Sequence, residues 1–317
     1  MTSISVIIPY YNRAACLGRC IDCVYRQSHR PVELILVDNA SDDGGPDVCR
    51  SLAAEYDAPD FRVKLLEAPC RGACQARNTG LEAATGDRVL FFDSDDEMLP
   101  EMLSSLCAAA DAFTAETGEA PDIVACRSRH DDGKIYPKQL TASPARHLVE
   151  TAVVTHNVCL KRDFARAVGP WNTALRRWQD LEYGFRLLLQ ASSTVWVDKP
   201  LYKVHDSADA ISAPSWIESR EALFDTIHAL GEDIEEAEEQ LSDDEQARLI
   251  TAMAFRMGSL AAALYRDGDR VLAETCHTHS LQTLPPSHQK YRPLLALHYA
   301  YTKRGGRGFW RVFRCFV

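Results

Sequence analysis

The sequence predicts an α/β protein with a Rossmann-like, mainly parallel sheet flanked by helices and followed by a C-terminal helical appendage. Two observations support this fold class. Short apolar, β-branched stretches alternate with helix-like stretches through the first half of the 317 residues, which is the pattern of βαβ units. From Ser215 onward the stretches are helix-like throughout. We therefore expect an α/β domain over residues 1–213 and a helical region over residues 214–317 that ends in a basic and aromatic tail.

Five stretches of the first half are expected to form strands, because they are short, apolar and rich in β-branched residues. They cover residues 4–8, 32–37, 62–66, 88–92 and 122–126. Pro9 is expected to end the first strand, since proline cannot donate a backbone hydrogen bond within a sheet. Helices are predicted over the stretch that carries Leu17, Ile21 and Val24 on one face, over residues 73–84, and from about residue 100.

The helical region carries two local signals. The acidic run 232–239 places Ile234, Ala237 and Leu241 on one face, which indicates a solvated amphipathic helix rather than an ion-binding site. Ser242 to Glu245 has the sequence of a capping box for the helix that follows.

The C-terminal tail combines cationic and aromatic side chains. The cations are Lys303, Arg304, Arg307, Arg311 and Arg314, interleaved with Phe309, Trp310, Phe313 and Phe316. At helical spacing the three phenylalanines share a face. Such a basic amphipathic helix can lie on an anionic membrane surface. It can equally pack on the rest of the protein or on a second subunit, and the sequence leaves these interpretations open.

Composition limits the class of partner. The formal net charge of −10 makes general nucleic-acid binding a poor expectation, because phosphate repels an acidic surface. The first residues lead directly into a strand-like stretch without the basic and apolar segments of a signal peptide, and no uninterrupted apolar run reaches the length of a membrane span. We therefore expect a cytoplasmic protein whose 11 cysteines are free thiols.

Polar residues follow three of the predicted strands where each strand ends. They are Pro9, Tyr10 and Tyr11 after the first strand, Asp38 after the second, and Asp93 and Asp95 after the fourth. Ligands of parallel α/β sheets bind beyond the carboxyl ends of the strands, so these residues are expected to meet at one edge. If the extended geometry continues, the carboxylates at 93 and 95 project to the same side. There both carboxylates can bind a divalent cation, or one can accept a hydrogen bond from a ribose hydroxyl while the other binds the cation.

Each further candidate residue has an ordinary structural alternative. Asp38 suits a nucleoside contact, but taken alone it is more typical of an Asx turn or a helix cap. Arg77 could neutralise a diphosphate or simply lie on a helix surface. Asp180 is expected near a helix N-terminus, where the dipole favours an ionised general base but where a capping carboxylate is equally natural. His205 could bind metal or phosphate, although a lone histidine more often does neither.

Taken together, these segments resemble the family 2 inverting glycosyltransferases, which have the GT-A fold. The matching segments are SVIIPYYNR at 5–13, VDNASDDG at 37–44, ARNTG at 76–80, FDSDD at 92–96, WQD at 178–180, and the loop 205–212. Each motif is weak alone. Several weak motifs in the family's order, over roughly the first two thirds of the chain, are far more specific.

The resemblance implies a role for each matching residue. It implies that Pro9, Tyr10 and Tyr11 contact the nucleobase, that Asp38 contacts the uracil, and that Arg77 contacts the base or the diphosphate. It implies that Asp93 binds the ribose, that Asp95 binds the divalent cation, and that His205 contacts the cation or the diphosphate. Asp180 would be the catalytic base that accepts the proton of the acceptor hydroxyl. Two positions depart from the family's pattern. Asn39 replaces the second aspartate of the commoner Asp-Asp turn, and Gln179 replaces the glutamate before the base, where its amide could hydrogen-bond a sugar hydroxyl.

The function that the resemblance implies is inverting transfer of a sugar from a nucleotide-diphosphate donor, expected to be a UDP-sugar. The cofactor would be Mn²⁺ or Mg²⁺. The acceptor would be a saccharide or a lipid-linked saccharide of cell-surface polysaccharide or glycolipid assembly, with peripheral membrane contact or dimerisation through the tail as open alternatives. Two rival functions are a sugar-phosphate nucleotidyltransferase and a catalytically silent carbohydrate-binding or scaffold protein on the same fold. Tyr10-Tyr11-Asn12 stands where the first rival has a glycine-rich, basic loop.

Overall fold

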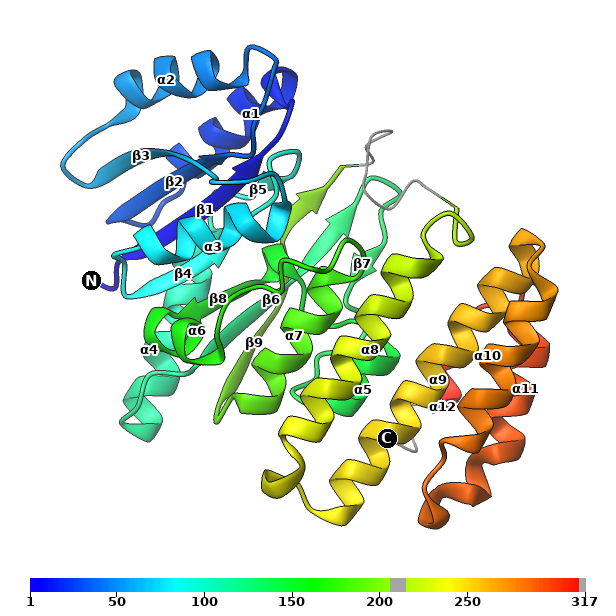
Figure 1. Ribbon diagram of the computed structural model, residues 1–317. Helices are drawn as coiled ribbons and strands as arrows, with labels where there is room; N and C mark the ends of the chain where they lie inside the picture. The colour runs from blue at the N-terminus through cyan, green and yellow to red at the C-terminus, as the bar shows by residue number, and fades with distance from the viewer. Residues whose placement is uncertain (206–214, 314–317) are drawn as a thin grey trace. The chain divides into compact units, whose positions relative to one another are not determined.

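The computed structural model of the chain describes residues 1–205 and 215–313 and divides into two compact units (Figure 1). The first unit comprises residues 1–140, 153–173 and 190–208, and the second comprises 141–152, 174–189 and 209–317. The division is therefore not contiguous, because two early stretches belong with the C-terminal helices. The loop that follows His205, the expected boundary at 213–214, and the tail residues Arg314 and Phe316 lie outside the described residues.

The first unit is built on a mixed, mostly parallel sheet, as the sequence predicts. Its strands are ordered β3-β2-β1-β4-β8-β6-β9-β5, and β7 pairs with β6. The first four in this order are parallel: β3 (Phe61–Glu67), β2 (Val32–Asp38), β1 (Ile4–Tyr10) and β4 (Arg88–Phe91). The others are β8 (Val158–Lys161), β6 (Ile123–His130), β9 (Thr194–Val204), β5 (Glu97–Met98) and β7 (Ile135–Tyr136). Strand β8 runs antiparallel to both β4 and β6.

The first strand is longer than predicted, because β1 continues through Pro9 to Tyr10. The expectation that Pro9 ends this strand is wrong for a local reason. The Ile7 carbonyl accepts the Phe92 amide on the β4 side of β1, and Pro9, two residues on, faces the same side. Strand β4 ends at Phe91, opposite Ile7. The missing N–H of Pro9 thus lies just past the last residue pair of the β1–β4 ladder, while on its other side β1 still pairs with β2.

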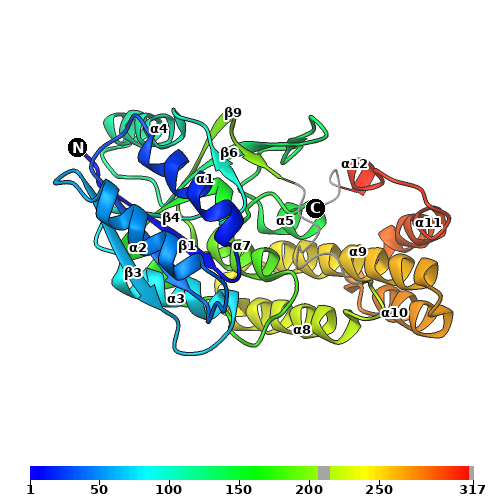
Figure 2. The same cartoon turned by 90° about the horizontal axis from the view of Figure 1, so that it is seen from above.

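Helices cover both faces of this sheet (Figure 2). The apolar side chains Ile4, Val6 and Ile8 of β1 pack in one core cluster with the buried faces of α1 (Ala14–Tyr25) and α4 (Met102–Thr117). The predicted stripe of Leu17, Ile21 and Val24 on α1 is buried in this cluster, as expected. Helices α2 (Gly45–Tyr56), α3 (Ala73–Ala83) and α6 (Arg162–Val168), with a 3₁₀ turn at Thr155–Asn157, complete the unit.

Helix α3 lies unusually close to strand β1. A Cβ atom added at Gly80 would lie 2.3 Å from Cγ2 of Ile7, far inside van der Waals contact. Only glycine fits at this crossing without displacing the helix. The glycine that ends the ARNTG motif therefore fixes how closely Arg77, one turn earlier on the same helix, approaches the sheet.

The second unit is entirely helical in its described part. Its elements are α5 (Pro144–Val149), α7 (Gln179–Gln190), α8 (Arg220–Glu236), η2 (Glu238–Gln240), α9 (Asp243–Asp267), α10 (Arg270–Gln282), η3 (Pro286–Tyr291), α11 (Arg292–Thr302) and α12 (Trp310–Phe313). The predicted capping box is present, since the Ser242 hydroxyl accepts the Glu245 amide and the Glu245 side chain accepts the Ser242 amide. The acidic run ends α8 and forms η2, and Ile234 and Ala237 are buried as predicted. The single helix expected through Leu241 is not present, because α8 ends at Glu236 and the half-buried Leu241 follows η2 in extended backbone.

Helix α9 is the central helix of the second unit. It is the one described helix whose length and hydropathy would allow a membrane span, and 67% of the relevant window is buried inside the protein. Such burial is typical of a core helix. Phe313, the last described residue, packs on α9, because it is fully buried and its ring stacks on Phe255 at 4.5 Å between centroids. For Phe313 the structure therefore shows packing within the unit.

Candidate functional site

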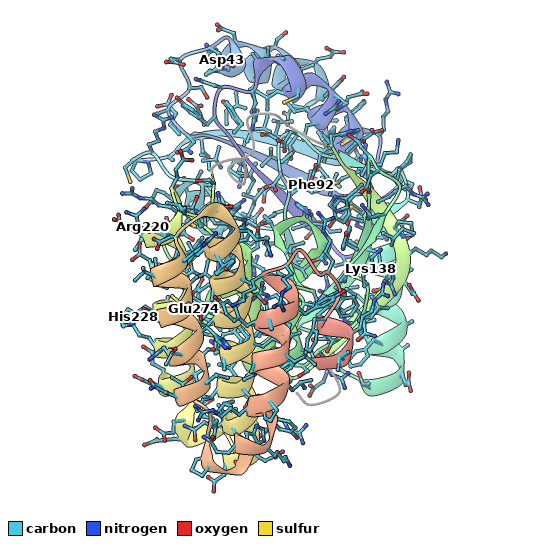
Figure 3. The ribbon with its side chains drawn as sticks, turned by 90° about the vertical axis from the view of Figure 1, so that its right-hand side faces the viewer. Asp43, Phe92, Lys138, Arg220, His228 and Glu274 are labelled. Atoms are coloured by element: carbon cyan, nitrogen blue, oxygen red, sulfur yellow. The ribbon has the colours of Figure 1, made fainter. Side chains whose placement is uncertain are left out.

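The ends of strands β1, β2 and β4 lie side by side in the first unit. Tyr10 at the end of β1 is paired with Asp38 at the end of β2, and the Asn39 amide donates to the Tyr10 carbonyl at 2.8 Å. Asp93 follows β4 two residues after its last residue. The buried Phe92, labelled in Figure 3, anchors the start of this turn. The strand-end clusters thus meet at one edge of the sheet, as the sequence indicates.

The first two strand-end loops are held together by polar side chains. The Asn12 amide nitrogen Nδ2 donates to Asp42 Oδ1 at 2.6 Å, and the Asp42 backbone amide donates to Asn12 Oδ1 at 2.9 Å. Asp43 (labelled in Figure 3) accepts the first amide of α1, from Ala14, at 2.9 Å. Asn12 and Ala40 both adopt left-handed backbone angles, with φ of 50° and 62°. Strained residues of this kind often cluster at ligand sites.

The predicted nucleobase residues differ in what they expose. The ring of Tyr10 belongs to the core, where burial raises its pKa well above the usual value. Tyr11 is half-buried, and the Arg71 guanidinium lies over its ring at 3.9 Å. Asp38 is almost fully buried and accepts the Ser41 amide at 3.1 Å, so the Asx-turn alternative is present at this residue. Of the two tyrosines, Tyr11 has the ring that a ligand could reach.

Asn39, one of the two departures from the family's pattern, has a structural function. Its Oδ1 accepts the Gly72 amide at 2.7 Å, which ties the loop after β2 to the N-terminus of α3. Gly72 adopts φ of 156°, and Asn39 is nearly buried. Because the bond uses a side-chain oxygen as acceptor, the neutral amide of Asn39 can form it in place of a carboxylate.

Arg77 and Asp93 form an ion pair at the same edge. Arg77 Nη2 lies 3.1 Å from Asp93 Oδ1, and the guanidinium stacks over the Trp171 ring at 4.7 Å. Trp171 is held in turn by Asn78, which exchanges two hydrogen bonds with its backbone at 2.8 and 2.9 Å. Arg77 is only 6% exposed, so it is not the helix-surface arginine of the structural alternative. Its cation is fixed beside the carboxylate.

His156 lies between two carboxylates and was not identified from the sequence. Its Nδ1 atom is 3.1 Å from Asp93 Oδ2 and 3.4 Å from Asp96 Oδ2. Burial by itself would raise the pKa of Asp93, but the hydrogen bond with His156 and the charge of Arg77 hold it below its usual value. Burial raises the pKa of Asp96 to about 7; the charge of His156 opposes that rise, and the charge of Asp93 adds to it.

The sheet register explains why His156 meets Asp93. Arg88 pairs with Lys161 and Leu90 with Cys159 across the antiparallel β4–β8 ladder. The same register carried three residues further places Asp93 opposite His156. The only sequence signal was a short apolar stretch after a polar one near residue 158, which does not reveal its partner strand.

The chain turns between Asp93 and Asp96, so the extended geometry assumed for this segment does not continue. The Asp96 amide donates to the Asp93 carbonyl at 3.3 Å, closing a turn over Ser94 and Asp95. Asp95 consequently has partners other than those of Asp93: its carboxylate lies 3.5 Å from Arg13. His205 donates its backbone amide to Asp96 at 3.2 Å, and its ring lies 3.1 Å from Asp131 and 3.4 Å from Glu97.

The three side chains Asp93, Asp96 and His156 could hold a divalent cation. One ligand atom from each lies within 4.8 Å of the others. Two ligands at right angles on an ion with bonds of about 2.1 Å lie about 3 Å apart, which is close to the 3.1 and 3.4 Å spacings from His156. Two carboxylates and one imidazole suit Mn²⁺, while all-oxygen sets are usual for Mg²⁺. The residues present therefore fit a cation.

Gln179 and Asp180 belong to the second unit. Helix α7 begins at Gln179, so Asp180 lies in its first turn, where the sequence places it. The Trp178 carbonyl accepts the amides of Leu181 and Glu182 at 3.0 and 3.2 Å, and Trp178 has a left-handed φ of 53°.

The half-buried Arg256 of α9 supports this turn within the second unit. Its guanidinium lies over the Trp178 ring at 5.3 Å, and it donates to the Leu148 carbonyl at 2.7 Å and to Thr151 Oγ1 at 3.1 Å. Burial lowers the pKa of Arg256 to about 10. The residue before Gln179 is therefore fixed both by its backbone and by packing of its ring.

Comparison with known proteins matches residues 5–144 to the model of glycosyl transferase family 2. The chain is 27% identical over 225 residues to the uncharacterised glycosyltransferase EpsJ of Bacillus subtilis (strain 168), covering 66% of this chain and 62% of that protein. It is 34% identical over 104 residues to the glycosyltransferase GlyG of Streptococcus pneumoniae serotype 4, covering 32% of this chain and 33% of that protein. The chain thus spans less than two thirds of these relatives' length.

Two solved structures share the fold. Residues 1–349 of TarS from S. aureus, in complex with UDP-GlcNAc, superpose with a TM-score of 0.71 at 18% identity, covering 99% of this chain and 92% of that one. The mannosyltransferase PcManGT from Pyrobaculum calidifontis, in complex with GDP-Man and Mn²⁺, superposes with a TM-score of 0.54 at 20% identity, covering 95% of this chain and 87% of that one.

Proposed function

The chain belongs to glycosyl transferase family 2 by its residues 5–144 and has a GT-A fold, and on this premise we propose that it transfers a sugar from a nucleotide-diphosphate donor to an acceptor hydroxyl. The observation that carries the proposal is the grouping of Arg77, Asp93 and His156 at the carboxyl edge of the sheet. The cytoplasm is the expected location.

We propose that the donor's nucleotide binds across the ends of β1, β2 and β4. Tyr11 would stack on or border the base, Asp38 would accept from it, and Arg77 would neutralise the diphosphate. The complexes of the solved neighbours with UDP-GlcNAc, UDP and GDP-Man support a nucleotide-sugar. A UDP-sugar follows from the family resemblance of the Asp38 turn.

A divalent cation held by Asp93, Asp96 and His156 would neutralise negative charge on the leaving nucleoside diphosphate. The mixed oxygen and nitrogen donors favour Mn²⁺ over Mg²⁺. The family resemblance instead gives the cation to Asp95, with His205 as a further ligand. The two ligand sets share no residue, so single variants can separate them.

Asp180 is proposed as the base that takes the proton from the attacking acceptor hydroxyl. The N-terminus of α7 favours the ionised carboxylate, which is the form a base needs. Direct displacement of the diphosphate by that hydroxyl would invert the anomeric carbon. Gln179 would bind a hydroxyl of the transferred sugar or of the acceptor, and saccharide or lipid-linked saccharide acceptors of surface polysaccharide assembly fit this chemistry.

The test is nucleotide release from a panel of UDP- and GDP-sugars with Mn²⁺, with and without a saccharide acceptor. Thermal stabilisation identifies the donor first, because a ligand that binds the folded state raises its apparent stability. Acceptor-dependent UDP release is the expected result. Pyrophosphate release from UTP and a sugar phosphate would instead indicate a nucleotidyltransferase. Donor binding without turnover under any acceptor would indicate a silent binding protein.

A further inference from the structure

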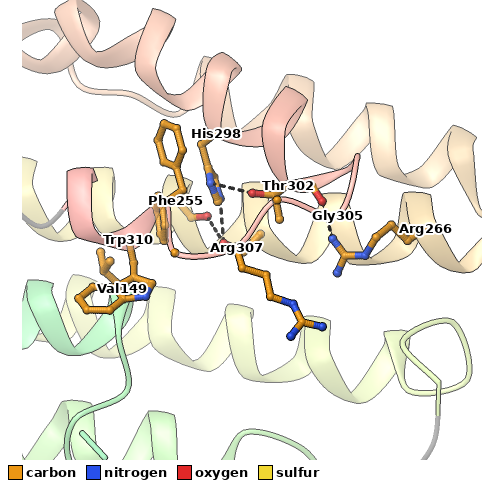
Figure 4. Close-up of a pocket in the computed structure, with 12 residues that line it drawn as sticks. Val149, Phe255, Arg266, His298, Thr302, Gly305, Arg307 and Trp310 are labelled. Carbon is orange, nitrogen blue, oxygen red and sulfur yellow. Dashed lines mark hydrogen bonds between the residues drawn. The ribbon is translucent and has the colours of Figure 1, made fainter. Parts of the chain in front are cut away.

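A pocket of about 420 Å³ in the helical unit lies among residues that the proposed function does not use (Figure 4). Its walls come from α9, from α11 and from the loop that joins α11 to α12. The described residues that line it include two arginines, Arg266 and Arg307, and no carboxylate. In a protein with a net charge of −10, a pocket whose charged lining residues are two exposed arginines is a candidate site for an anion.

One wall of the pocket contains a continuous series of hydrogen bonds from Thr302 to the Phe255 carbonyl. Thr302 Oγ1 lies 3.2 Å from His298 Nδ1, His298 Nε2 lies 2.9 Å from Ser259 Oγ, and Ser259 donates to the Phe255 carbonyl at 3.1 Å. Burial lowers the pKa of His298 to about 4, so this histidine is neutral. The positive charge of the pocket therefore comes from the two arginines alone.

The loop that carries Arg307 has a fixed course. Gly305 and Gly308 adopt left-handed φ angles of 91° and 83°. A Cβ atom on Gly306 would lie 2.3 Å from the Tyr301 ring, and the Gly306 amide donates to the Tyr301 carbonyl at 3.1 Å. Tyr301 also donates its hydroxyl to the Arg307 carbonyl at 3.3 Å. Arg307 is thus presented from an ordered turn.

The two guanidinium groups extend to the same side of this loop, as Figure 4 shows. Arg266 Nη1 is anchored by a 2.6 Å hydrogen bond to the Thr302 carbonyl, which leaves the outer edge of its guanidinium for a ligand. Neither arginine forms an ion pair with any described residue. Two like charges facing one pocket repel each other, and a bound anion removes that repulsion while accepting paired hydrogen bonds.

The remaining wall is aromatic. Phe309 and Trp310 line the pocket with half-buried rings, whereas the Phe255 ring is covered by His298 at 4.1 Å and by Phe313 at 4.5 Å. Flat rings beside an anion site suit a ligand that joins an anion to a ring or carbon skeleton with an apolar face. A pocket of this volume accommodates a group of monosaccharide size together with one phosphate.

We propose that this pocket binds a phosphate ester of a sugar or polyol, with the phosphate between Arg266 and Arg307 and the carbon skeleton against Trp310. This site is separate from the donor site of the proposed function and does not depend on it. The phosphate could belong to a soluble sugar phosphate or to a lipid headgroup, because both present the same diffuse anion to the arginines.

The first experiment titrates glucose 1-phosphate into the full-length chain by calorimetry, without divalent cation. Arg266→Gln and Arg307→Gln should each weaken binding about tenfold or more, since a hydrogen bond to a charged group is worth at least that factor. Arg292→Gln, an exposed arginine of α11 outside the pocket, is the matched control and should bind like the parent. Trp310→Ala should weaken glucose 1-phosphate binding but leave inorganic phosphate binding unchanged.

The second experiment identifies the source of the phosphate. Co-sedimentation with vesicles of phosphatidylglycerol, against vesicles of phosphatidylcholine, tests a headgroup. Vesicle binding that is lost in the double variant Arg266→Gln/Arg307→Gln, with no binding of glucose 1-phosphate, assigns the site to a lipid phosphate. The proposal is overturned if the double variant binds both probes like the parent, or if Arg292→Gln loses as much affinity as the pocket variants. Mn²⁺-dependent UDP affinity reports separately on the proposed donor site.

Discussion

Replacing Gly80 with alanine tests whether the close contact of α3 with β1 positions the candidate site. The new Cβ atom would lie 2.3 Å from Ile7 Cγ2, so the helix must move outward. Overpacking of this kind costs about 1–3 kcal/mol. Alanine in a helix interior stabilises the folded state by about 1 kcal/mol relative to glycine. We therefore expect Gly80→Ala to lower the free energy of unfolding by up to about 2 kcal/mol.

The same substitution should have the opposite sign when Ile7 is also shortened. In an Ile7→Ala background the clashing methyl is gone, and only the helix-propensity gain of about 1 kcal/mol remains. The double-mutant cycle should thus give a coupling energy of about 1–3 kcal/mol between the two positions. Urea unfolding followed by circular dichroism measures each free energy, provided the slope with urea is unchanged.

Because α3 carries Arg77, Gly80→Ala should also weaken Mn²⁺-dependent UDP binding by calorimetry. Thr79→Ala, a substitution at the neighbouring position of the same helix, is the matched control for general helix effects and should leave UDP affinity near that of the parent. The reasoning is refuted if Gly80→Ala stabilises the parent by about the amount expected from propensity alone, or if its effect is the same in both Ile7 backgrounds.

Three further outcomes are expected. Asp180→Asn should keep donor affinity while the turnover rate falls about 10²- to 10⁴-fold, and near-parental turnover would reject Asp180 as base. Asp96→Asn should abolish the Mn²⁺ dependence of UDP binding while Asp95→Ala retains it, and the reverse result would favour the ligand set of the family resemblance. Burial, helped by the charge of Glu182, raises the pKa of Asp233 to about 7. The folded state thus disfavours the ionised form, so stability should fall as pH rises from about 4 to 7, and Asp233→Asn should remove that fall in melting temperature measured across pH.

The local parts of the site were predictable from the sequence. Strands β1, β2 and β4 were identified because buried parallel strands leave continuous apolar, β-branched stretches. Tyr11, Asp38 and Asp93 were placed at the ends of those strands, since each directly follows an apolar run. The helix start before Asp180 and the capping box at Ser242 were predictable for the same reason: their signals lie within a few residues.

Longer-range features were decided only by the tertiary structure. His156 meets Asp93 because β8 inserts antiparallel beside β4, a pairing across about sixty residues that no local periodicity encodes. Arg77 became a buried partner of Asp93 because Gly80 lets its helix approach the sheet. The partners of Asp95 also come from another segment, since Arg13 lies 3.5 Å from its carboxylate and Arg19 of α1 donates to its carbonyl at 2.7 Å.

The sequence by itself therefore determined the fold class and the strand ends that carry the candidate residues. The reason is that the signals for buried strands and for turns depend on residues that are neighbours in the chain. The tertiary structure alone decided which side chains share a site and that the stretch bearing Asp180 belongs with the C-terminal helices. The physical reason is that strand pairing and helix packing join residues far apart in the chain, and their free energy depends on partners that local sequence does not name.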